Sequence, residues 1–226
     1  MRNRRKHNDC SPLRAAVRRK DLSSLYLNSV SRRILTPVND SFDLLFSVAL
    51  GIGLAAATGF RVFVPLLVAG LAARAGWVPL TESFAWLQST PALVALSTAA
   101  VLEILAFYIP GLDHLLDVLA GPLAVIAGVL ASASVMVDMP PEVRWPIAVI
   151  AGGGVAALTK GATAVVRAKS AALTGGLGNP VVSTAETAGA ATVSILAIVA
   201  PLLCLAGVIA IVVWGIRRLH RRVSDS

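Results

Sequence analysis

The stretch TAGAATVSILAIVAPLLCLAGVIAIVVW, residues 187–214, runs for 28 positions without a charged side chain and decides the class of fold. A helix needs about 20 apolar residues to cross the hydrocarbon core of a bilayer. At about 1.5 Å per residue this stretch reaches about 42 Å, against a core of about 30 Å. We therefore expect either one long tilted helix or two short helices that meet near Ala200 and Pro201, since proline suits the first position of a helix.

The composition of the whole chain agrees with a membrane protein. Hydrophobic residues make up 56% of the 226 residues and charged residues 14%, with a mean hydropathy of +0.77. A soluble domain carries about 25% charged residues. The net charge of +8 lies at the two ends: residues 1–40 carry +7, residues 41–216 carry −2 and residues 217–226 carry +3. Basic flanks around an apolar body predict a polytopic membrane protein and no nucleic-acid partner.

The apolar runs predict an all-α bundle of about six transmembrane helices. They lie at residues 44–60, 62–73, 92–109, 118–137, 145–166 and 187–214. Only Arg61 separates the first two, so we expect them to form one long interrupted element. With that element counted once, the total is five if the last run is one span and six if it is two. Both basic termini should be cytoplasmic, which requires an even number and favours six.

The chain divides into three regions. Residues 1–40 form a basic leader for which we expect disorder, and an alternative is a mis-called start with Val38 as the initiating residue. Residues 41–216 form the transmembrane domain, and residues 217–226 a basic cytoplasmic tail. Cys10 lies in the leader and Cys204 in an apolar run, which predicts no disulfide. Small-residue helix faces allow a homodimer without requiring one.

A weak internal repeat predicts two half-repeats, at about residues 43–138 and 144–216. GLAAAT at 53–58 matches GVAALT at 154–159, and GPLAVIAGVL at 121–130 matches APLLCLAGVI at 200–209. Three spans per half would invert the halves relative to each other, as in many secondary transporters with interrupted helices. We expect the interruptions at 58–61 and 159–161, which both combine a threonine, a glycine and a cation. Alternatively, the glycines only let helices pack closely.

Four charged residues lie inside or at the edge of the expected spans: Arg61, Glu103, Lys160 and Glu186. A charge at the centre of a spanning helix costs about 2.5–3.5 kcal/mol. We therefore expect the four to gather around a shared polar centre that serves as a substrate or ion pathway, with Thr58 and Thr159 beside it. The alternatives are that these pairs only hold the bundle together, or that a carboxylate takes up a proton, as in proton-coupled carriers.

A glycine-rich loop precedes an expected helix start at Asn179 and Pro180, which suit the N-cap and first helical positions. Free N–H groups and the helix dipole at such a start favour an anion. The candidate anion-binding loop consists of Thr174, Gly175, Gly176, Gly178 and Asn179. The alternative is a plain helix start.

Asp113, His114 and Asp117 form a weak candidate metal site, because two carboxylates four residues apart share one helix face. Capping and solvation at the membrane surface are the alternative. The sequence contains no catalytic triad, HExxH motif or phosphate-binding loop, so we expect neither an enzyme nor a cofactor. Residues 79–87 predict a short helix on the membrane surface, with Phe84, Trp86 and Leu87 dipping into it.

Three segments carry a resemblance to a known family: GLAAATGFRVFVP at residues 53–65, Glu103 with YIPGLD at 108–113, and TGGLGNP at 174–180 before Glu186. On these segments, residues from about 43 to 214 resemble the bacterial membrane family catalogued as domain of unknown function 4126. The resemblance implies an integral protein of the bacterial inner membrane and supplies no activity.

Three functions fit this sequence. The first is a small secondary transporter or translocator for a solute or ion, in which the halves rock about a midplane polar site. The second is a non-catalytic scaffold or assembly protein, whose buried charges only set the packing. The third and least favoured is an intramembrane lipid enzyme that uses the acidic turn at residues 113–117.

Overall fold

The computed structural model describes the backbone of residues 37–106 and 112–224, and the side chains of residues 41–106 and 119–213 with Gly215 and Arg217. The chain divides into the units Met1–Phe42 and Asp43–Ser226, and the description below concerns the second. The regular elements in the described ranges are all helical, which confirms the all-α prediction. The leader for which we expected disorder spans residues 1–40. Its residues 1–36 lie outside the described residues, and residues 37–40 form the first turn of a helix, so the prediction is wrong for these four.

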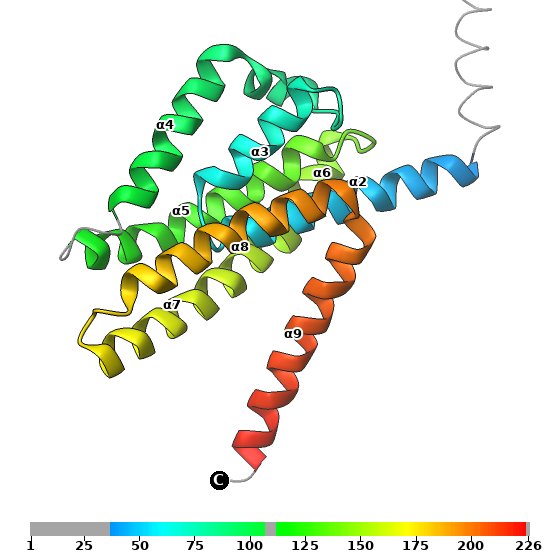
Figure 1. Cartoon of the computed structure of the whole chain (residues 1–226). Coiled ribbons are helices and arrows are strands. Elements are labelled where there is room, and N and C mark those ends of the chain that lie inside the picture. Colours follow the sequence, from blue (N-terminus) through cyan, green and yellow to red (C-terminus); the bar gives the residue numbers. More distant parts are fainter. Residues whose placement is uncertain (1–36, 107–111, 225–226) are drawn as a thin grey trace, which may run out of the picture. The chain divides into compact units, whose positions relative to one another are not determined.

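The helices follow one another along the chain, joined by short connections (Figure 1). The elements are α2 (Pro37–Thr58), α3 (Phe63–Arg74), the 3₁₀-helix η1 (Glu82–Gln88), α4 (Thr90–Ala106), α5 (Leu112–Val135), α6 (Pro141–Ile147), the π-helix η2 (Ala148–Gly153), α7 (Gly154–Thr174), α8 (Asn179–Val199) and α9 (Pro201–Ser224).

Among the described residues, three helices are long and apolar enough to cross a membrane. They are Ser41–Thr58, the run Pro141–Thr174 through α6, η2 and α7, and Asn179–Val199. A fourth is added if η1 and α4, which are bent by 69°, count as one span. The remaining apolar helices are shorter. Six spans and the inverted repeat therefore stay predictions, while the apolar helices are those of a membrane protein.

The two helices of the α7–α8 pair have their polar side chains inside and their apolar side chains outside. Helix α7 buries Lys160, Thr163 and Arg167 on one face, whereas Leu158 is 57% exposed. Helix α8 buries Glu186 in the same way. A helix on the surface of a soluble protein has the opposite polarity. An apolar outer surface fits hydrocarbon, so this arrangement supports a location within the bilayer.

Small residues hold the helices together at short distances. Helix α5 packs along η2 and α7, α3 along α4 and α8, and α8 along α7 and α9. A Cβ atom on Gly53 of α2 would lie 2.7 Å from the Cβ of Ala197 and 2.9 Å from the Sγ of Cys204. Side-chain packing between helices replaces the hydrophobic effect in a bilayer, which explains the many buried alanines and glycines.

The predicted interruption of the first long element is confirmed, and the second interruption is wrong. Helix α2 ends at Thr58 and α3 begins at Phe63, but α7 continues without a break through residues 159–161. Gly161 adjoins open space in the middle of α7. A glycine costs a helix about 1 kcal/mol, which is too little to interrupt one that is packed against its neighbours. The irregular backbone in this part of the chain is instead the π-helix η2, which directly precedes α7.

The two threonine-glycine-cation motifs nevertheless meet in space. A Cβ atom on Gly59 would lie 2.4 Å from the Cβ of Thr159 and 2.8 Å from the backbone nitrogen of Lys160. The hydroxyl of Thr163 lies 3.4 Å from the carbonyl oxygen of Gly59. Helix α7 therefore rests directly against the break, which we define as residues 59–62 between α2 and α3.

The long uncharged run forms two helices, which is the second of the two alternatives above. Helix α8 ends at Val199 and α9 begins at Pro201, because proline has no N–H to continue the first helix. The expected surface helix at 79–87 is the 3₁₀-helix η1. Its Phe84 and Leu87 are buried inside the protein with Ala133 and Ala148, and Trp86 is exposed. The prediction that Phe84, Trp86 and Leu87 all dip into the membrane is therefore wrong.

We predict that Gly59→Ala lowers the free energy of unfolding by about 1–3 kcal/mol, because its methyl group overlaps Thr159 and the backbone of Lys160. The matched control is Gly161→Ala, which meets no atom within 4 Å and should be neutral or stabilising by up to about 1 kcal/mol. Denaturation by sodium dodecyl sulfate in mixed micelles measures both. Equal effects of the two variants would contradict the close contact at the break.

Candidate functional site: a buried ion cluster beside an apolar cavity

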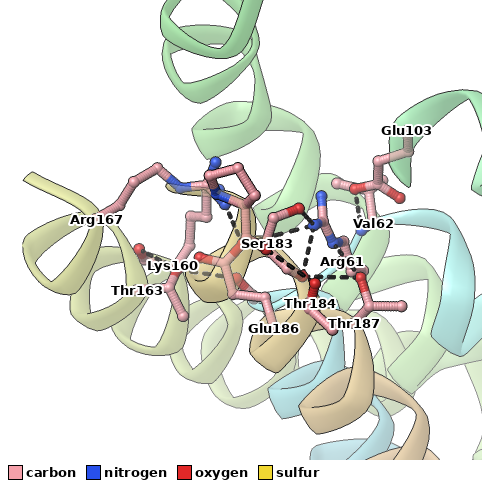
Figure 2. Close-up of polar contacts among 12 residues, drawn as sticks. Arg61, Val62, Glu103, Lys160, Thr163, Arg167, Ser183, Thr184, Glu186 and Thr187 are labelled. Atoms are coloured by element: carbon pink, nitrogen blue, oxygen red, sulfur yellow. Dashed lines mark hydrogen bonds and ion pairs between the residues drawn. The ribbon is translucent and has the colours of Figure 1, made fainter. Parts of the chain in front are cut away.

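Glu186 of α8 lies at the centre of a group of buried charges (Figure 2). Its Oε2 atom accepts a hydrogen bond from Nη2 of Arg167 on α7 and lies 3.9 Å from Nη2 of Arg61 at the break. The exposed fractions are 5% for Glu186, 3% for Arg167 and 1% for Arg61. Lys160 of α7 is also buried and acts electrostatically on Glu186. We call these four residues the ion cluster.

Arg61 reaches α8 from the break through its side chain. Its Nη2 atom donates to the carbonyl oxygen of Ser183 at 2.9 Å and also contacts the hydroxyl of Ser183. Its Nε atom donates to the hydroxyl of Thr187 at 3.1 Å. Hydrogen bonds to a charged group are stronger than those between neutral groups. These contacts therefore fix the guanidinium beside Glu186 and tie the break to α8.

Glu103 has a different role from that of the ion cluster. Its carboxylate, on α4, accepts hydrogen bonds from the backbone N–H groups of Val62 at 2.8 Å and Phe63 at 3.1 Å. These N–H groups begin α3, where they have no partner within the helix. Glu103 therefore caps α3 and fixes the turn that carries Arg61. The structure brings Arg61, Lys160 and Glu186 together and places Glu103 at this cap, which corrects the expectation of one centre for all four.

The two threonines predicted beside the polar centre lie in different places. Thr58 is fully buried, and its hydroxyl lies 2.7 Å from the carbonyl oxygen of Ala55 and 3.2 Å from that of Ala124. It therefore links α2 to α5. Thr159 donates to the carbonyl oxygen of Val155 within α7 and lines the cavity described next.

A cavity of about 630 Å³ lies between α7, α8, α9 and the end of α2. Its wall is apolar apart from Thr159, Thr163 and Glu186. Cavities of about 300–1,000 Å³ are typical of small-molecule sites. The Oε1 atom of Glu186 is buried and accepts no hydrogen bond from any residue that the structure describes. Glu186 thus belongs both to the ion cluster and to the cavity wall.

The glycine-rich loop between α7 and α8 is closed by its own hydrogen bonds. The N–H groups of Leu177 and Gly178 donate to the carbonyl and hydroxyl oxygens of Thr174, and that of Asn179 donates to the carbonyl oxygen of Gly176. Gly175 and Gly176 have positive φ angles of 61° and 92°, which glycine adopts without strain. Gly178 is the N-cap, one residue before the expected Asn179. This geometry supports the plain helix start.

The candidate metal residues Asp113, His114 and Asp117 belong to the first turns of α5, and their side chains lie outside those that the structure describes. Among the side chains that are described, no three His, Cys, Asp or Glu residues gather closely enough to hold a metal ion. Cys204 is a buried free thiol, and Cys10 lies outside the described residues.

The sequence analysis missed three residues of this region: Arg167 as a partner of Glu186, and Ser183 and Thr187 as partners of Arg61. Their spacing carried a signal. Lys160, Thr163 and Arg167 recur at intervals of three and four residues in an apolar helix, which places them on one face. Ser183, Glu186 and Thr187 follow the same rule on α8. Polar residues at helical spacing inside apolar helices therefore indicate an interior polar site.

We predict that Glu103→Gln lowers the free energy of unfolding by about 1–2 kcal/mol, because glutamine keeps only one acceptor for the two N–H groups at the start of α3. The matched control is Glu82→Gln, at an exposed carboxylate, which should change stability by less than about 0.5 kcal/mol. Denaturation in mixed micelles measures both variants. A neutral Glu103→Gln would contradict the capping role.

The ion cluster predicts strong coupling between Arg167 and Glu186. Removing either residue leaves the other without this partner, and the loss of Glu186 that Arg61 and Lys160 experience is the same in the single Glu186 variant and in the double variant, so the cycle isolates the Arg167–Glu186 contact. In a double-mutant cycle of Arg167→Gln and Glu186→Gln, we expect a coupling energy of about 1–3 kcal/mol. The unfolding free energies of the wild type, both single variants and the double variant measure it, and additive effects would contradict a direct pair.

Residues 48–221 match the family described as Domain of unknown function (DUF4126), a range that contains the ion cluster and the cavity lining. No curated protein and no solved structure matches the chain. The family match covers more than half of the chain and agrees with the resemblance seen in the sequence. The protein is therefore a member of the DUF4126 family.

Proposed function

We propose that this protein is a small membrane carrier, a secondary transporter or translocator, whose site is the ion cluster together with the adjoining cavity. The observation that carries this proposal is the position of Glu186, which pairs with Arg167 through one carboxylate oxygen and lines the cavity, while its other carboxylate oxygen is buried and accepts no hydrogen bond from the described residues. An occupant of the cavity would therefore meet the ion cluster directly. The proposal does not include an enzymatic reaction.

The cavity supports a carrier over a scaffold. The cavity is a depression that opens to the outer surface between α7 and α9, whereas helices that only pack together close such spaces. Charges that served only to hold helices together would be most stable with the space around them filled. Here about 630 Å³ adjoins the most costly group in the bilayer, a carboxylate surrounded by three cations. Buried carboxylates of this kind serve as proton relays in many transporters.

Glu186 is placed to couple protonation to movement. When it is ionised, it attracts Arg167 of α7 and Arg61 of the break, and so holds three elements together. When it is protonated, that attraction is lost, and α7 and α8 are held less firmly to the break. Alternating access then follows from movement of these helices about a fixed site. The break at 59–62 separates α2 from α3, and the junction before Pro201 separates α8 from α9.

The proposal includes the location inferred from charge. The basic residues at both ends support a cytoplasmic location of both termini, with the bundle in the bacterial inner membrane. The lipid bilayer is then the immediate surrounding of the exposed apolar side chains of α7 and α8.

A scaffold is the second candidate, and specific contacts favour it. Arg61 bonds the carbonyl oxygen of Ser183, and Glu103 bonds the backbone of the break, as in a purely structural brace. A scaffold requires these contacts but does not require the cavity to be accessible from both sides of the membrane. Accessibility therefore separates the two functions without knowledge of the substrate.

We predict that a cysteine at Ala185, on the cavity wall, reacts with a membrane-impermeant maleimide from both sides of the membrane. The background is Cys10→Ser with Cys204→Ala, and the matched control is Ala188→Cys, on the same helix but away from the cavity. Glu186→Gln, which mimics the protonated form, should shift the ratio of labelling between the two sides. Labelling of Ala185→Cys from one side only, unchanged by Glu186→Gln, would favour the scaffold.

A further inference from the structure

We infer that the cavity binds a single-chain amphiphile with an acidic headgroup, whose head lies at Glu186, the member of the ion cluster that lines the cavity, and whose chain lies between α7, α8 and α9. The inference rests on the proposed carrier function, in which the bound ligand is the substrate that is moved, and it names the chemical class of that substrate. It comes from three features: the chemistry of the wall, the bonding of Glu186 and the sign of the surrounding charge.

The wall of the cavity offers few hydrogen-bond partners to a strongly polar solute and therefore disfavours its binding. Apart from Glu186, its polar members are Thr159 and Thr163, whose hydroxyls donate to the carbonyl oxygens of Val155 and Lys160 within α7. The other lining side chains, such as Leu158 and Ile211, are apolar. Burial of a polar group without a hydrogen bond costs several kcal/mol, on the order of 2–7. A sugar or a hydrated ion would lose its hydration here without replacement, whereas a hydrocarbon chain would not.

The bonding of Glu186 determines the chemistry of the ligand's headgroup. Its Oε1 atom is buried and needs a donor, and its Oε2 atom already contacts Arg167. An acidic headgroup meets both conditions. When the carboxylate of Glu186 turns toward the cavity, the O–H of the headgroup donates to it, so that the two acids share one proton. Two adjacent carboxyl groups readily share a proton, because both cannot be ionised at short distance.

The charge of the site favours an anionic over a cationic headgroup. Among the described residues, three cations act on Glu186: Arg167 and Lys160 from α7 and Arg61 from the break. An alkylammonium head could donate to Oε1, but it would face all three positive charges at close range in a medium of low dielectric constant. The same three charges attract a carboxylate or phosphate head.

The cavity is also open to the surface that faces lipid. Leu158 and Val166 of α7 and Ile211 of α9 line it, and each is more than half exposed. A chain that is already dissolved in the bilayer can therefore enter between α7 and α9 without crossing water. A cavity of about 630 Å³ is in the range that encloses a ligand of this size.

The test uses tritiated palmitate and the full-length protein in nanodiscs of phosphatidylcholine, with scintillation proximity as the measure of binding. We expect saturable binding that unlabelled palmitate displaces. Acetate, which has the head without the chain, and hexadecyltrimethylammonium, which has the chain with a cationic head, should not displace it at equal concentration. Displacement by the ammonium compound as effective as that by palmitate would overturn the acidic headgroup.

Two matched pairs of variants locate the site. Ala185→Trp fills the cavity and should abolish binding, whereas Ala188→Trp, on the same helix outside the cavity, should not. Arg167→Gln should weaken binding by about tenfold or more, as expected for one lost charge-assisted hydrogen bond, whereas Lys169→Gln, at an exposed cation of the same helix, should not. Equal binding by Ala185→Trp and Ala188→Trp would place palmitate elsewhere and overturn the inference.

The failure of this inference and the failure of the carrier proposal give different results. Two-sided labelling of Ala185→Cys without palmitate binding leaves a carrier and overturns the ligand class. Palmitate binding that Ala185→Trp abolishes, combined with one-sided labelling, leaves the ligand site and overturns the carrier.

Discussion

The carboxylate of Glu186 is compensated by guanidinium groups from two other elements, and the arrangement of the bundle depends on this contact. Arg167 reaches it from α7 and Arg61 from the break between α2 and α3. In a medium of low dielectric constant, a buried charge without partners is far more costly than a lost apolar contact. The contact requires α7, α8 and the break to meet at one place. The missing side chain of Gly59 lets α7 approach, and Glu103 holds the start of α3 so that Arg61 points toward α8.

The same contact underlies the proposed carrier function and the inferred class of ligand. An ion cluster completely enclosed by protein would be a brace, and a cavity completely lined by hydrocarbon would take up any apolar molecule. Here the two share a wall at Glu186, so that an occupant is selected by its apolar body and by one acidic group at its end. A change in the charge of Glu186 affects both the occupant and the packing of three elements, which is the physical requirement for coupling binding to movement.

The polarity of the helices follows from the bilayer as solvent. With apolar lipid outside, burial of leucine or valine in the interior gains little, and small residues take those places because they allow close contact between helices. The contact of Gly53 with Ala197 and Cys204 shows this at the α8–α9 junction. Polar residues are left to occupy the interior faces of α7 and α8, where they find one another rather than lipid.

The sequence by itself determined the membrane class, the family, the break before Arg61 and the helix boundary at Pro201. These depend on local properties, namely hydropathy over about 20 residues and the backbone preferences of glycine and proline. Only the tertiary structure decided that α7 continues through Gly161, that Glu103 caps α3, that the loop before α8 bonds to itself and that Arg167 completes the ion cluster. Arg61 and Ser183 are 122 residues apart, and the pairing of such distant groups depends on which helices pack together. A single sequence shows which charges need a partner in the bilayer, and packing selects the partner.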